Sequence, residues 1–272
     1  MRSPLVRPKF YPIVAAASLA TTLARKANGR VDGFVIEGPT AGGHNAPPRG
    51  EMKLSDTGEP IYGDRDVVDL AKIRELQLPF WLAGGVGSPA GLQLALEAGA
   101  AGIQVGTLFA FADESGIVPE RKTEVLAGVH RGAVQVRTDP RASPTGYPFK
   151  LVELAGAHYQ SPTRERVCDL GYLRVAYRRA DGRIGLRCPA EPVDAYVAKG
   201  GALDDTVGRR CLCNALTANI GLGQLRPDAV DEEPLLTSGD DLVGMAGFLQ
   251  GRAQYAAADV IDYLLAGTRR PC

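Results

Sequence analysis

Residues 33–45 join a short apolar run to a glycine pair and a histidine. The run at 34–36 contains only β-favouring apolar residues, which is typical of a strand buried on both faces of a sheet. Gly42 and Gly43 permit positive φ or the close approach of a flat ligand, and His44 places an imidazole beside that gap. The stretch therefore predicts a parallel strand that ends at a binding site, with a turn carrying a surface histidine as the alternative.

The same rhythm of strand, helix and strand recurs on both sides of this stretch. We expect strands at 11–17, 33–37, 79–83 and 102–105, separated by helices at 18–27, 67–77 (capped by Asp66) and 89–98 (capped by Ser88). Such βαβ units form right-handed crossovers between parallel strands. Residues 45–65 are rich in proline and glycine, so they predict a long loop, either a binding loop or a disordered excursion.

The composition favours a small-molecule partner. The 272 residues carry 31 cationic and 31 acidic side chains, so no charge imbalance points to nucleic acid or to an anionic membrane. No apolar run approaches the roughly 20 residues that span a bilayer, and the first ten residues do not resemble a secretory signal. We therefore expect a cytoplasmic protein with reduced cysteines.

Two further strand ends present small residues. The strand at 79–83 runs into Gly84 and Gly85, and the strand at 102–105 runs into Gly106 and Thr107. In (β/α)₈ barrels the loops after the last two strands commonly hold a phosphate. Glycines that only let a helix pack on the sheet are the alternative reading.

Taken together, these motifs resemble the second half of a nitronate monooxygenase (2-nitropropane dioxygenase-like) barrel. The resemblance rests on four motifs in the family's order, within residues 10–116: Pro12-Ile13-Val14, Ala41-Gly42-Gly43-His44, Leu82-Ala83-Gly84-Gly85-Val86 and Gly102-Ile103-Gln104-Val105-Gly106-Thr107. Related FMN-dependent enoyl-acyl-carrier-protein reductases share these motifs. Later motifs near 138–146, 168–172 and 211–216 look like a longer branch that includes the enoyl reductase components of polyketide-type synthases.

The resemblance implies FMN as the cofactor and assigns residues to it. The phosphate would lie on the loops at Gly84-Gly85 and Gly106-Thr107, with Gln104 in the same motif, and the isoalloxazine ring would lie near Gly42 and Gly43. By the same match, His44 takes the catalytic position. A neutral nitroalkane must lose its α-proton before it is oxidised, and an imidazole suits that task.

The implied reaction is oxidation of an alkyl nitronate or nitroalkane by molecular oxygen. An NAD(P)H-dependent enoyl-thioester reductase of a fatty-acid or polyketide pathway is the first alternative, and a non-catalytic fragment or assembly subunit is the second. The sequence does not name the physiological substrate.

The final part of the chain is less informative. We expect a loop at 137–150, a hairpin at 173–186 with an Asp-Gly turn, and helices at 189–197, 208–220, 240–250 and 256–265. Cys168, Cys188, Cys211 and Cys213 include only one close pair, and it is C-x-C, so their spacing favours buried apolar thiols and no metal site.

The expected fold class is α/β: the second half of a TIM-type barrel at 1–130, followed by an α-rich extension of mixed loops and helices at 131–272. A closed barrel needs eight strands, and only four are expected here. The chain is therefore expected to be a fragment of a longer parent, to close with a separate N-terminal half, or to pair with a second copy.

Overall fold

The computed structural model describes residues 6–154, 164–226 and 231–266. Its central sheet has four parallel strands in chain order: β1 (Ile13–Val14), β2 (Phe34–Glu37), β3 (Phe80–Ala83) and β4 (Gly102–Gln104). The α/β class and the parallel sheet are confirmed, although β1 is shorter than the expected strand at 11–17. Strands added in chain order, without a reversal, are the order found in barrels and not in doubly wound sheets.

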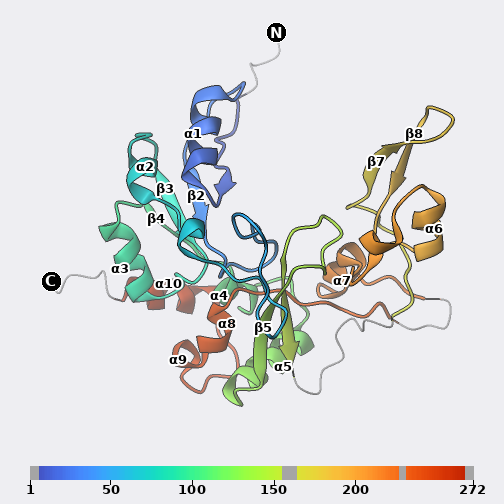
Figure 1. Ribbon diagram of the computed structural model, residues 1–272. Coiled ribbons are helices and arrows are strands. Elements are labelled where there is room, and N and C mark those ends of the chain that lie inside the picture. Colours follow the sequence, from blue (N-terminus) through green and yellow to red (C-terminus); the bar gives the residue numbers. More distant parts are fainter. Residues whose placement is uncertain (1–5, 155–163, 227–230, 267–272) are drawn as a thin grey trace, which may run out of the picture.

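Three helices connect these strands (Figure 1): α1 (Ala17–Lys26), α2 (Leu70–Arg74) and α3 (Pro89–Glu97). They pack on the sheet through one apolar core, in which Ala20 of α1, Ile73 of α2 and Ala95 of α3 are buried with Phe34 and Phe80. Because the helices supply this cover, the short strands can be apolar throughout.

The cap of α2 differs from the sequence expectation. Asp69, not Asp66, accepts hydrogen bonds from the backbone N–H groups of Ala71 and Lys72. Asp66 ends a separate 3₁₀ turn, η1 (Asp64–Asp66), and accepts from the backbone N–H of Gly63. An N-cap carboxylate accepts from the backbone N–H groups two or three residues after it, so Asp69 and not Asp66 is placed to cap a helix that begins at Leu70.

A second core lies beyond β4. It is built by α4 (Thr107–Ala110), α5 (Pro119–His130), the antiparallel pair β5 (Val134–Asp139) and β6 (Phe149–Leu154), and the late helices α8 (Asp241–Gly244), α9 (Ala246–Leu249) and α10 (Ala257–Leu265). The expected loop at 137–150 is shorter, at 140–148, because its two ends belong to this strand pair. The helix expected at 240–250 is divided into α8 and α9, and Gln250 ends it with a φ of 48°.

A third part contains the antiparallel hairpin β7 (Val175–Arg178) and β8 (Ile184–Arg187), then α6 (Val193–Ala198), η2 (Leu203–Thr206) and α7 (Leu212–Ala218). Figure 1 shows the hairpin extending away from the parallel sheet. The hairpin at 173–186 is confirmed. Because the described residues after 130 contain four strands as well as helices, this part is mixed rather than α-rich. Within the described ranges, no helix is long and apolar enough to cross a membrane.

Candidate functional site

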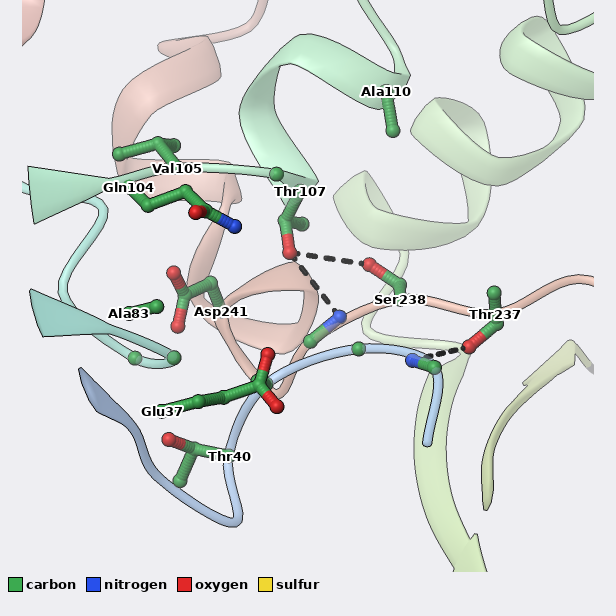
Figure 2. Close-up of a pocket in the computed structure, with 17 residues that line it drawn as sticks. Glu37, Thr40, Ala83, Gln104, Val105, Thr107, Ala110, Thr237, Ser238 and Asp241 are labelled. Carbon is green, nitrogen blue, oxygen red and sulfur yellow. Dashed lines mark hydrogen bonds between the residues drawn. The ribbon is translucent and has the colours of Figure 1, made fainter. Parts of the chain in front are cut away.

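A cavity of about 340 Å³ lies where β2, β3 and β4 end. Seven residues that the sequence predicts as cofactor-binding line it together: Gly42, Gly43, Gly84, Gly85, Gln104, Gly106 and Thr107. Parallel strands bring these loops to one edge of the sheet, which is where ligands bind in open α/β sheets. Figure 2 shows the cavity, with the side chains of Glu37, Gln104 and Asp241 directed into it.

The sequence did not point to the other wall of the cavity. That wall is formed by a late segment, residues 237–241, of which Thr237, Ser238, Gly239 and Asp241 line the cavity. Glu37 and Thr40, at and just after the end of β2, also line it. The only sequence signal was a run of small polar residues after Leu235 and Leu236, which no local pattern connects to the sheet.

Hydrogen bonds hold this late segment against the glycine loops. The backbone N–H of Gly43 donates to Thr237 Oγ1 at 2.8 Å, and that of Gly239 donates to Thr107 Oγ1 at 3.2 Å (Figure 2). The backbone N–H of Asp240 donates to the carbonyl of Thr40 at 3.0 Å. These bonds join residues roughly two hundred and more than one hundred positions apart, so the cavity depends on tertiary structure.

Gly42 is required by chain packing. A Cβ atom at this position would lie 2.7 Å from the carbonyl carbon of Ser238 and 2.8 Å from the nitrogen of Gly239. Both are backbone atoms that cannot move aside easily, so a side chain here would push the late segment off the site.

Gly85 and Gly106 have the features of an anion-binding loop. Gly85 has a φ of 70°, which favours glycine, and a Cβ at Gly106 would meet no atom within 4 Å. Within the described residues, neither backbone N–H donates to a protein acceptor. Both residues line the cavity, and their free backbone N–H groups could bind an anionic group such as a phosphate.

Among the described residues, the ionisable side chains that line the cavity are both acidic. Burial raises the pKa of the Glu37 and Asp241 carboxyls above their usual values. Asp241 Oδ2 accepts a hydrogen bond from the backbone N–H of Gly87 at 3.3 Å, beside the Gly85 loop. An anion at this loop would therefore be tolerated best when Asp241 is in its neutral, protonated form.

His44 lines a separate, adjoining cavity of about 360 Å³. Its walls are largely apolar and include Ile13, Val14 and Leu19, and Glu37 lines both cavities. The predicted catalytic histidine and the predicted cofactor-binding residues thus occupy neighbouring spaces at the same edge of the sheet.

The ring of His44 is held by two contacts. Its Nε2 lies 2.6 Å from Ser143 Oγ, and the ring meets Phe149 edge to face with centroids 4.8 Å apart. Burial lowers the pKa of His44 below the ordinary 6.5, so the imidazole is mainly neutral at pH 7 and can accept a proton. Sequence reasoning missed Ser143 because no local pattern shows which residue of the β5–β6 loop contacts His44.

An ion pair between Lys150 and Asp240 lies next to the glycine loop. The buried Lys150 Nζ lies 2.6 Å from Asp240 Oδ1, and the Lys150 backbone N–H donates to the carbonyl of Gly43 at 2.9 Å. Lys150 therefore contacts both the glycine loop and the late segment that closes the cavity.

The fold and the cavity define an α/β protein with a ligand site at the carboxyl ends of parallel strands. Residues 8–138 match the nitronate monooxygenase family. This match confirms the resemblance read from the sequence motifs over these residues.

Several solved structures are similar to this chain over part of their length. FabK from Thermotoga maritima is 16% identical with a TM-score of 0.47, and 95% of this chain covers 60% of that protein. A nitroalkane oxidase from Streptomyces ansochromogenes is 19% identical with a TM-score of 0.48, and the match covers 95% of this chain and 57% of that protein. The enoyl reductase domain of MlnA from Bacillus amyloliquefaciens is 12% identical with a TM-score of 0.48, and the match covers 88% of this chain and 56% of that protein.

The chain thus spans 56–60% of the length of these proteins. No curated protein matches the chain significantly.

Proposed function

We propose that this chain is an FMN-dependent oxidoreductase that oxidises alkyl nitronates with molecular oxygen. The observation that carries the proposal is the cavity at three successive strand ends, all three of which lie inside the segment that matches the nitronate monooxygenase family.

The residues present suit FMN. The backbone N–H groups of Gly85 and Gly106 would bind its phosphate, Thr107 and Gln104 would add polar contacts, and Gly43 leaves open space for the ring system. When bound, FMN would take electrons from the substrate and pass them to oxygen, while the protein orients and shields the reactants. A protonated Asp241 would remove the charge conflict with the phosphate.

His44 would act on neutral nitroalkanes as the general base. Its lowered pKa keeps it neutral at pH 7, and the apolar cavity beside it suits an alkyl chain. We assign the proton of His44 to Nε2, donating to Ser143 Oγ, because Ser143 can then donate its own proton to Thr145 Oγ1 at 2.8 Å while also accepting from the Thr145 backbone N–H. This assignment leaves Nδ1 as the proton acceptor. A preformed nitronate needs no base.

Anaerobic flavin reduction tests the proposed reaction. We would reconstitute the purified chain with FMN, remove oxygen and follow loss of the flavin absorbance after adding propyl nitronate or NADPH. Reduction by the nitronate, with recovery of absorbance on admitting oxygen, is expected. Reduction by NADPH alone, followed by reoxidation with an enoyl thioester, would assign the enoyl reductase activity instead. Failure to bind FMN at all would favour a non-catalytic role.

We also propose the domain division. Residues 1–130 would form half of an FMN-binding barrel, and residues 131–272 would form an extension packed on it. The support is the four-stranded parallel sheet, whose order is that of a barrel segment. The remaining strands would come from a longer parent, a separate chain or a second copy, and β1 is the sheet edge that would receive them. Ile13 on this edge is 54% exposed, which leaves apolar surface for such a partner.

A further inference from the structure

Three segments that carry cysteines converge in the part of the fold around α7. Cys211 precedes this helix directly and Cys213 is its second residue. The fully buried Asn214 ties the segment of Cys168 to α7, because its Nδ2 donates to Asp169 Oδ2 at 2.9 Å and its Oδ1 accepts from the backbone N–H of Leu170 at 3.5 Å.

Arg166 joins the third segment to the same place. Two residues before Cys168, its Nη1 donates to the carbonyl of Pro189 at 3.1 Å, and Pro189 follows Cys188. The same guanidinium donates through Nη2 to the carbonyl of Thr206 at 2.7 Å. The two cross-links together hold all four cysteines in one region, although 45 positions separate the first from the last in the sequence.

The sulfur atoms of Cys188 and Cys211 have polar partners on the backbone. Cys188 and Cys211 are buried, and each sulfur accepts a backbone N–H, from Ala190 and from Asn214 respectively. Backbone N–H groups two or three residues after a cysteine, directed at its sulfur, suit a thiolate that binds a metal.

The surrounding structure has little apolar core of its own. The hairpin β7–β8 forms a separate two-stranded sheet, and its residues Val175, Ile184 and Leu186 are all more than half exposed. Of residues 164–226, only Leu212 and Ala215 are fully buried members of an apolar core cluster. An isolated hairpin is at best marginally stable in water, and small units with a poor core usually need a disulfide or a metal.

We propose that Cys168, Cys188, Cys211 and Cys213 together bind one zinc ion, as a structural site that fixes residues 164–226. Four cysteine sulfurs are a common ligand set for structural zinc, which they surround as a tetrahedron. The spacing in the sequence argued against a metal because only one close pair exists. In the fold, hydrogen bonds of Arg166 and Asn214 bring the distant cysteine segments together.

The metal would complete the site. Within the described ranges, no three His, Cys, Asp or Glu side chains are already grouped to hold a metal ion, so the four thiols would have to reorient around the metal as it binds. Each cysteine can turn about a single side-chain torsion, and metal sites of this kind commonly form together with the metal. Zinc would displace the thiol protons, and the guanidinium groups of Arg166 and Arg174, which interact electrostatically with these cysteines, would offset the net negative charge of the tetrathiolate.

Elemental analysis of the purified full chain tests the site. We expect about one zinc per chain, and we expect each of the variants Cys168→Ser, Cys188→Ser, Cys211→Ser and Cys213→Ser to lose most of it. Cys272→Ser is the matched control, since it removes the fifth cysteine of the chain, and it should keep its zinc.

A second measurement does not depend on the variants folding. Wild-type protein exchanged with Co²⁺ should show the intense visible bands of tetrahedral cobalt bound to thiolates, and releasing the metal with a chelator should increase cleavage by protease within 164–226. Absence of zinc both as purified and after reconstitution, or a stoichiometric iron signal in its place, would overturn the proposal. Neither measurement involves the flavin, so failure here is separate from failure of the proposed oxidoreductase activity.

Discussion

The imidazole Nε2 of His44 lies 2.6 Å from the hydroxyl of Ser143, 99 positions later in the chain. Ser143 is fully buried, and its hydroxyl is also hydrogen-bonded to Thr145. These bonds hold the hydroxyl in place beside the imidazole ring. One face of the site is therefore set by the β5–β6 connection, which lies outside the parallel sheet.

Replacing Ser143 by Ala should lower the turnover of a neutral nitroalkane by about tenfold, the effect of losing one hydrogen bond that orients the base. Turnover of preformed nitronate should change much less, because that substrate needs no base. Steady-state kinetics on both substrates would check this, with the exposed Ser18→Ala as control. Equal losses on both substrates would mean that Ser143 only supports the fold.

His44→Asn should reduce turnover of a neutral nitroalkane by about 10²- to 10⁴-fold, the usual contribution of a general base. Most activity on preformed nitronate should remain. If both activities fall together, His44 positions the ligand and is not the base.

The pH dependence of the neutral-substrate reaction should reflect the pKa of His44. Burial lowers this pKa below 6.5, so the base form predominates at pH 7 and is lost only as the pH falls through the lowered value. We expect kcat/KM to be level above pH 7 and to fall in the acid range, with no such fall for preformed nitronate. A midpoint above pH 7 would contradict the assignment.

Two glycine substitutions should separate cofactor binding from folding. Gly106→Val places its side chain in open space facing the cavity, so it should weaken FMN binding without changing the Tm of the free protein. Gly42→Ala forces a Cβ against backbone at 2.7 Å and should destabilise the fold by about 1–3 kcal/mol.

Fluorescence titration with FMN and thermal melting would measure both effects. Gly29→Val, at a position with no atom near its Cβ, is the matched control. Unchanged FMN affinity in Gly106→Val would refute the phosphate assignment, and an unchanged Tm in Gly42→Ala would refute the packing argument.

Replacing Asp240 should cost more stability than replacing Lys150, its partner in the ion pair. Asp240→Asn leaves the buried Lys150 ammonium without its charged partner, so it should cost about 1–3 kcal/mol of stability, with Asp240 being 41% exposed. Lys150→Met removes the buried charge itself and should cost less. Urea unfolding would compare the two, with the exposed Lys72→Met as control, and a larger loss in Lys150→Met would contradict this account.

The sequence by itself determined the parallel sheet and the glycine side of the cavity. The apolar runs at 34–36 and 79–83 specify buried strands locally, and each is followed by the glycines that end it. Ser88 likewise caps α3 as expected, since its Oγ accepts from the backbone N–H of Gly91 at 3.0 Å. These features depend on neighbours within a few residues, which a linear pattern contains.

Only the tertiary structure decided which distant residues complete the site. Ser143 and Thr237 reach the site through chain segments with no periodic pattern, and the backbone approach at Gly42 cannot be seen from the residue types. The cysteines show the same limit, because Asn214 and Arg166 bring together positions whose spacing predicts no cluster. Contacts of this kind form only after the helices have packed, since it is the packing of the cores that fixes where each loop lies.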